Sequence, residues 1–140
     1  MNTSQRKGTG QCLCGQVCFS YRDDPLWVGH CHCQSCRRNT GCAVATFVGY
    51  HPDNIHFTKN NRNYYSSSTG VRRSFCANCG TPISYEADHF PGEIHLYVSA
   101  FDRPEEFPPS RHVHFEEKIH WFDTADDLPR VDKGGIEPTS

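Results

Sequence analysis

The chain has 140 residues, 36% of them hydrophobic, with eleven glycines, nine prolines and a single methionine. This length fits one domain with a modest core, and the composition argues against long helices. A formal charge of −2 with a pI near 6.5 excludes the strongly basic surface that is typical of nucleic-acid-binding proteins.

Short runs of β-branched and aromatic residues, separated by turn formers, predict a mainly β domain with very little helix. In chain order these runs are Gln16–Tyr21, Leu26–His32, Cys42–Tyr50, Ile55–Thr58, Asn63–Ser68, Val71–Phe75, Thr81–Glu86, Glu93–Ser99 and His112–Phe115. Only Cys33–Thr40 has the pattern of a short helical turn. Polar and apolar residues alternate irregularly within the runs, so the strand order stays open.

The two ends of the chain are polar and rich in turn-forming residues. We therefore expect residues 1–7 and 128–140 to be flexible and the domain to span residues 8–127. The first residues carry charge but no apolar segment of the kind found in secretory signals. The longest apolar run, Cys42–Val48, is too short to cross a bilayer. A cytoplasmic location is expected.

Nine cysteines are many for a chain of this size. Thiols that stay reduced in the cytoplasm indicate, when clustered, either metal binding or redox chemistry. Seven of them lie in three motifs: Cys12-Leu13-Cys14-Gly15, Cys31-His32-Cys33-Gln34-Ser35-Cys36 and Cys76-Ala77-Asn78-Cys79-Gly80. The remaining two, Cys18 and Cys42, are expected to be buried as small hydrophobic residues.

The first and third motifs each direct two sulfurs to one point. Cys12 and Cys14 are two residues apart on an extended backbone, so their side chains point to the same side. Cys76 and Cys79 form a C-x-x-C motif followed by Gly80, which is typical of a tight metal-binding turn. Together the pairs supply four thiolates, which predicts a closed tetrahedral zinc site with a structural role.

The middle motif leaves three cysteines for a second site. Cys31 and Cys33 share one side of an extended segment, and a short turn brings Cys36 to the same point. Three protein ligands leave the fourth position of a zinc ion for water or substrate, which is typical of catalytic zinc. We therefore interpret this motif as an open zinc site.

Other interpretations of the middle motif remain open: it can belong to a cluster with mixed ligands, or be a redox trio without metal. Redox C-x-x-C motifs usually begin a helix after a strand of a βαβ unit, and the sequence contains no such unit. His30 and His32 alternate with the cysteines, so we expect them to point away from the sulfurs. His112 and His114 are expected to be strand residues rather than ligands.

Three runs, Gly10–Val17, Cys31–Arg38 and Arg73–Thr81, resemble in this order the glutathione-dependent formaldehyde-activating enzyme family, which also includes centromere protein V. The resemblance extends from about Gly8 to Asp127. It implies a zinc-dependent β-tent of packed short antiparallel sheets. It also implies one structural zinc on the outer motifs and a second zinc on the middle motif, with these ligands: Cys12, Cys14, Cys76 and Cys79 for the first, and Cys31, Cys33 and Cys36 for the second.

The activity that the resemblance implies is the condensation of formaldehyde with glutathione, a carbon–sulfur lyase-type reaction. We therefore expect an enzyme with two zinc ions that adds a thiol such as glutathione to a small aldehyde, or reverses that step. Arg37, Arg38 and Arg73 are candidate partners for the two carboxylates of glutathione.

A non-catalytic zinc-binding module for a protein partner is the alternative. No nucleic-acid or membrane partner is expected. The sequence does not decide between a monomer and a dimer, nor does it name the substrate.

Overall fold

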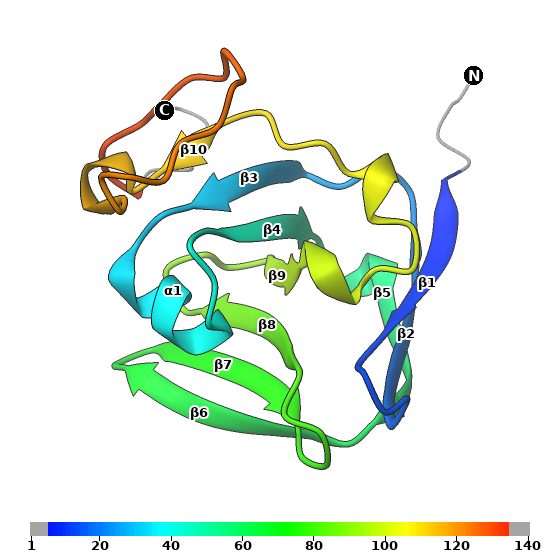
Figure 1. The fold of residues 1–140 in the computed structure, drawn as a ribbon. Coiled ribbons are helices and arrows are strands. Elements are labelled where there is room, and N and C mark those ends of the chain that lie inside the picture. Colours follow the sequence, from blue (N-terminus) through cyan, green and yellow to red (C-terminus); the bar gives the residue numbers. More distant parts are fainter. Residues whose placement is uncertain (1–5, 135–140) are drawn as a thin grey trace.

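A computed structural model of the chain describes residues 6–134 (Figure 1). These residues form ten strands in two sheets, one short α-helix and four 3-10 turns. The prediction of a mainly β domain with very little helix is confirmed. Within the described part of the chain, no helix has the length and apolar character needed to cross a membrane.

The smaller sheet is antiparallel and has the order β1-β2-β5. Its strands are β1 (Lys7–Gln11), β2 (Val17–Arg22) and β5 (Ile55–Asn60). In Figure 1 this sheet stands across the right-hand side of the larger one.

The larger sheet has the order β10-β3-β4-β9-β8-β7-β6, and all neighbours are antiparallel except β10 and β3. Its strands are β3 (Trp27–Cys31), β4 (Ala45–Tyr50), β6 (Arg62–Ser68), β7 (Val71–Cys76), β8 (Pro82–Ala87), β9 (Ile94–Tyr97) and β10 (His112–Val113). The helix α1 (Gln34–Thr40) joins β3 to β4. The 3-10 turns are η1 (Pro52–Asn54), η2 (Val98–Ala100), η3 (Pro104–Glu106) and η4 (Phe115–Glu117).

Aromatic side chains fill the space between the two sheets. Phe19 and Tyr21 are buried on alternate positions of β2, and they contact the buried rings of Phe101 and Phe107. The ring centroids of Phe19 and Phe101 are 5.2 Å apart, and those of Tyr21 and Phe107 are 5.3 Å apart. Pairs of this kind contribute about 0.5–1.5 kcal/mol beyond the burial of their surface. This core packs the β1–β2 hairpin, whose turn contains Cys12 and Cys14, against the larger sheet.

The N-terminal strand β1 was not among the predicted strands, and only its first residue, Lys7, belongs to the segment that was expected to be flexible. It pairs with β2 from Lys7 to Gln11. Its sequence, Lys-Gly-Thr-Gly-Gln, contains no large hydrophobic residue. Position 10 requires glycine, because a Cβ on Gly10 would collide with the Phe19 ring and lie 2.5 Å from the Ala100 carbonyl oxygen. Close packing of backbone therefore replaces the side-chain pattern that identifies the other strands.

The segment after residue 128 also differs from the expected flexible end, as far as it is described. The Val131 amide donates to the His112 carbonyl at 2.8 Å, and the His112 amide donates to the Pro129 carbonyl at 2.9 Å. Arg130 and His112 form a parallel bridge. These bonds attach residues 129–133 to β10; the rest of the two predicted flexible ends, residues 1–5 and 135–140, lies outside the described residues.

Candidate metal centres

The cysteines of the first and third motifs meet at the turns after β1 and β7. Cys14 Sγ lies 3.7 Å from both Cys12 Sγ and Cys76 Sγ. The sulfurs of Cys12, Cys14, Cys76 and Cys79 all lie within 4.8 Å of one another. Sulfurs at the corners of a tetrahedron around an ion, with bonds of about 2.3 Å, are roughly 3.8 Å apart, whereas a disulfide needs about 2.05 Å. The four thiols therefore have the spacing of metal ligands.

Hydrogen bonds to the sulfurs of this group favour the thiolate form that a metal requires, although burial raises the pKa of Cys76. The backbone amide of Val17 lies 3.2 Å from Cys12 Sγ, and that of Cys79 lies 3.4 Å from Cys76 Sγ. The hydroxyl of Thr81, 3.2 Å from Cys79 Sγ, lowers the pKa of that thiol to about 5. Donors aimed at sulfur stabilise its negative charge.

The middle motif brings its three sulfurs together at the junction of β3 and α1. Cys31 ends β3, Cys33 is the N-cap of α1, and Cys36 lies in its first turn. Cys31 Sγ and Cys36 Sγ are 3.6 Å apart, and Cys33 Sγ accepts from the Cys36 amide at 3.3 Å. Cys31 and Cys36 are buried, while Cys33 is partly exposed. Within residues 6–134, no fourth metal-ligating side chain joins this group.

The contacts within the middle group favour Cys33 as its thiolate. Hydrogen bonds from Cys31 and Cys36 hold the pKa of Cys33 far below its usual range. The same contacts, together with burial, raise the pKa of Cys31. Because a bound cation needs thiolates, binding must displace the remaining protons. The arrangement is therefore a pre-assembled group of soft donors.

A buried arginine lies beside the middle group. Arg73 Nη1 is 3.6 Å from Cys36 Sγ and 3.4 Å from the hydroxyl oxygen of Tyr97. Its Nε donates to Ser67 at 3.0 Å, and the Tyr97 oxygen also accepts from the Asn39 amide group at 2.7 Å. Three thiolates around a divalent cation carry a net negative charge, which a guanidinium in this position offsets.

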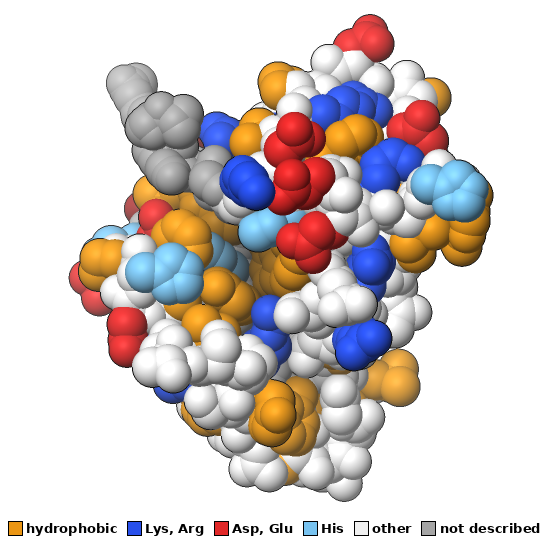
Figure 2. Space-filling view, turned by 90° about the vertical axis from the view of Figure 1, so that its left-hand side faces the viewer, with side chains coloured by type: hydrophobic (Ala, Val, Ile, Leu, Met, Phe, Trp, Pro, Cys, Tyr) orange, Lys and Arg blue, Asp and Glu red, His pale blue; other side chains and the backbone are white. Residues whose placement is uncertain are grey.

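The same face of the molecule is hollowed. A depression of about 270 Å³ is lined by Ser35, Arg38, Asn39, Tyr65, Ser67 and Arg73. Figure 2 looks onto the side that carries α1, where hydrophobic side chains lie recessed among charged and histidine side chains. A small polar ligand has access to this side of the protein.

The sequence matches the model of the glutathione-dependent formaldehyde-activating enzymes over residues 7–117, a range that contains all three cysteine motifs. The chain belongs to this family. No curated protein matches the sequence at a significant level. Among solved structures, the crystal structure of a Rhodobacter sphaeroides protein, a structural genomics target, aligns with a TM-score of 0.57. That alignment covers 88% of this chain and 99% of the other at 19% identity, so it concerns the fold alone.

Of the arginines that the resemblance to formaldehyde-activating enzymes suggested, two line the depression and one does not. Arg38 and Arg73 both face it, Arg38 from the exposed side of α1. Arg37 Nη1 donates to the carbonyls of His32, at 3.2 Å, and Glu117, at 2.8 Å. Arg37 thus ties η4 to the middle motif, and we keep Arg38 and Arg73 as candidates for substrate binding.

Two cysteines of this family member lie outside the metal-ligand groups. The expectation that both are buried is wrong: Cys42 is exposed and Cys18 is partly exposed. Cys42 Sγ lies 3.6 Å from the Thr40 carbonyl, and Cys18 Sγ lies 3.2 Å from the Gly15 carbonyl. The helix α1 extends to Thr40, so β4 begins only at Ala45 and leaves Cys42 in the surface turn.

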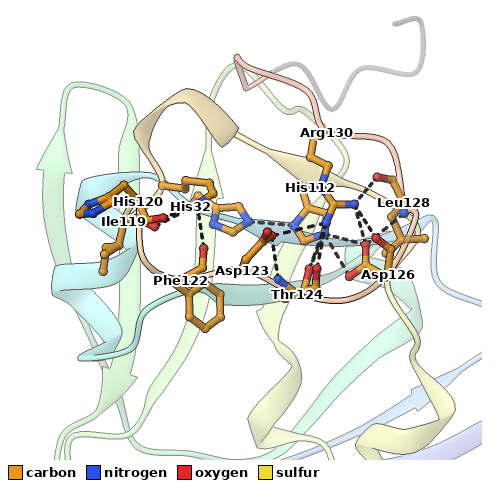
Figure 3. Close-up of polar contacts among 11 residues, drawn as sticks. His32, His112, Ile119, His120, Phe122, Asp123, Thr124, Asp126, Leu128 and Arg130 are labelled. Carbon is orange, nitrogen blue, oxygen red and sulfur yellow. Dashed lines mark hydrogen bonds and ion pairs between the residues drawn. The ribbon is translucent and has the colours of Figure 1, made fainter.

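The histidines beside the middle motif belong to a separate group (Figure 3). His32 Nε2 is 2.8 Å from His112 Nδ1, and His112 Nε2 is 3.1 Å from Asp126 Oδ1. His30, His112 and Asp126 each place a potential ligand atom within 4.8 Å of the others. Burial is the largest of the effects that lower the pKa of His32 to about 4. His114 is elsewhere engaged, with Nδ1 3.4 Å from a Glu117 carboxylate oxygen.

Sequence reasoning did not find three of the polar residues around these groups. Asn39 lies three residues after Cys36, so the spacing of a helix could have predicted that the two side chains lie on the same face of α1. Tyr97 and Asp126 reach their partners only through tertiary contacts, and no spacing in the sequence indicates them.

Proposed function

We propose that this protein is a zinc-dependent enzyme of the carbon–sulfur lyase type that joins a thiol such as glutathione to a small aldehyde such as formaldehyde, or catalyses the reverse reaction. The observation that carries the proposal is the convergence of only three metal-ligating side chains, among those described, at Cys31, Cys33 and Cys36. A basic depression lies on the same side, where Arg73 contacts Cys36.

The chemistry of the donors fits zinc in both cysteine groups, because thiolates at this spacing form tetrahedral sites. Cys12, Cys14, Cys76 and Cys79 would hold a closed ion with a structural role. Zinc held by Cys31, Cys33 and Cys36 would supply an open position that binds a thiol as thiolate or polarises a carbonyl oxygen.

The residues around the middle group can serve the addition step. The thiol releases its proton to solvent, the resulting thiolate sulfur forms a bond to the aldehyde carbon, and the carbonyl oxygen takes up the electron pair of the broken π bond and one proton. The Tyr97 oxygen accepts from Asn39 and Arg73 and so helps to fix two residues that line the depression. Tyr97 is itself buried, and burial raises the pKa of its hydroxyl, which makes it a weak acid. We therefore assign it a positioning role, and the proton for the carbonyl oxygen comes from solvent.

Arg38 and Arg73 suit the carboxylates of glutathione, since guanidinium groups bind carboxylates through paired hydrogen bonds. The depression of about 270 Å³ is small for a tripeptide, so part of the substrate would remain in solvent. Arg73 is buried and holds Cys36 and Tyr97, whereas Arg38 is exposed. Arg38 is therefore the better position to test substrate binding alone.

Replacing Arg38 with alanine is expected to raise KM for glutathione roughly fivefold, with little change in kcat, because an exposed charge pair contributes about 1 kcal/mol. Steady-state kinetics with glutathione and with 2-mercaptoethanol, which lacks carboxylates, measure this. The matched control is Arg72→Ala, which removes an exposed arginine paired with Asp88 at 3.1 Å. An equal rise in KM for both thiols, or for both variants, contradicts the assignment.

The function itself is tested with the metal-loaded protein, glutathione and formaldehyde. Exchange NMR is expected to show condensation faster than the spontaneous reaction. In cobalt-loaded protein, sulfur-to-metal absorption should fall in two steps as chelator is added, because the ion with three protein ligands leaves first. Activity should disappear with the first step.

If the chelator removes both thiolate-bound ions in a single step, the ion at Cys31, Cys33 and Cys36 does not have an open coordination position. Absence of acceleration with every thiol and aldehyde pair, while both ions stay bound, leaves the non-catalytic zinc module as the better description.

A further inference from the structure

Three residues outside the cysteine groups meet at one point from three segments of the chain. His30 lies on β3, His112 on β10, and Asp126 in the loop that leads to the C-terminal segment. We propose that these residues form a third metal site, with two histidines and one carboxylate, for a divalent ion of the first transition series. The proposal is independent of the reaction catalysed at the cysteines.

His112 and Asp126 already have the spacing of neighbouring ligands around an ion, and the His30 ligand atom lies within 4.8 Å of both. His112 Nε2 lies 3.1 Å from Asp126 Oδ1 and 3.3 Å from Oδ2. With bonds of about 2.0–2.1 Å, neighbouring ligands are roughly 2.9 Å apart in an octahedron and 3.4 Å apart in a tetrahedron. An ion can therefore replace the hydrogen bond between these two groups with little movement of either.

Both histidines are held in the manner of metal ligands. His30 Nδ1 is 2.7 Å from the Thr46 hydroxyl, and His112 Nδ1 is 2.8 Å from His32 Nε2. Each imidazole thus has one nitrogen held by a neighbour, and the second nitrogen of His112 faces Asp126. Metal-ligating histidines usually have such a partner on the second nitrogen, which sets the orientation of the ring.

Asp126 is fixed by hydrogen bonds that leave one oxygen available (Figure 3). Arg130 Nη1, at 2.8 Å, and the Leu128 amide, at 3.0 Å, both donate to Oδ1. Hydrogen bonds from Thr124 first, and then from the Leu128 amide, His112 and Arg130, hold the pKa of Asp126 well below its usual range, so the carboxylate is ionised. Oδ2 lies 3.3 Å from His112 Nε2, and the Thr124 hydroxyl lies 3.4 Å from the same nitrogen.

Two features set the affinity below that of the thiolate sites. Arg130 forms an ion pair with Asp126 at 2.8 Å, and a bound cation would compete with this positive charge for the carboxylate. Binding at His112 Nε2 also requires the proton between the histidines to lie on His112 Nδ1, so His32 must carry its own proton on Nδ1. That atom is buried and has no hydrogen-bond partner among the described residues, which is unfavourable.

The test uses protein whose thiolate sites are filled with zinc, to which Ni²⁺ is added in equilibrium dialysis. One further equivalent is expected to bind, and long-range ¹H–¹⁵N NMR should show the His32 proton move from Nε2 to Nδ1. Asp126→Asn should weaken this binding at least tenfold, while Asp127→Asn, an exposed neighbour, should not change it. Both variants should contain as much zinc as the unmodified protein.

His30→Gln provides a second variant, because it leaves the Asp126–Arg130 and His32–His112 contacts in place. It should lose the third equivalent as Asp126→Asn does. Two results would overturn the proposal: the unmodified protein binds no Ni²⁺ beyond its two zinc ions, or both variants bind Ni²⁺ as tightly as the unmodified protein. His30, His112 and Asp126 would then form only a hydrogen-bonded link between β3 and the C-terminal segment.

Discussion

Cys79→Ala is expected to leave the purified chain largely unfolded. Cys79 belongs to the group that joins the turn after β1 to the turn after β7. Zinc in a four-thiolate site contributes on the order of 10 kcal/mol of apparent binding free energy, and the net stability of a whole domain is about 5–15 kcal/mol. Loss of one ligand therefore removes a share of stability comparable with the total. Circular dichroism and zinc analysis of the variant measure this.

Cys18→Ala is the matched control for that variant. Cys18 is also partly exposed and lies near the same group, with its sulfur 3.2 Å from the Gly15 carbonyl, but it is not one of the four ligands. Its replacement should change the free energy of unfolding by about 1 kcal/mol or less. If Cys79→Ala folds and melts like Cys18→Ala, the four-cysteine group does not hold the fold together.

The second large effect is expected at the middle motif, where Cys33→Ser should fold normally but lose its second zinc ion and its activity. Cys33 is the N-cap of α1, and its sulfur accepts from the Cys36 amide at 3.3 Å. Serine is a favoured N-cap, so the helix keeps its first hydrogen bond. The change removes only a soft thiolate ligand from a site that has three.

Thermal unfolding, zinc content and the rate of thiol addition, measured on the same preparation, distinguish the outcomes. Cys42→Ser is the control, since Cys42 is exposed and lies outside both cysteine groups. The variant at Cys33 should retain the four-cysteine ion and a melting temperature close to that of the control. Unchanged activity would exclude the middle group as the catalytic site, and unfolding comparable with Cys79→Ala would assign it a structural role.

Local spacing in the sequence predicted the two cysteine groups because short-range geometry decides them. Cys31 and Cys33 share one side of the chain, and Gly80, with φ of 81°, ends the turn of the third motif in a conformation that favours glycine. The other strands were found from runs of β-branched and aromatic residues between turn formers. The strand β1 was not, since its glycines serve close backbone packing instead.

The sequence by itself thus determined the mainly β class, the three cysteine motifs and the partition of their thiols into four and three. Only the tertiary structure decided what surrounds them. Arg73 reaches Cys36 because the first half of β7 lies beside α1, and Asp126 reaches His112 because the C-terminal segment pairs with β10. Such contacts depend on strand order and register, which short irregular strands do not encode locally, so no spacing in the sequence could indicate them.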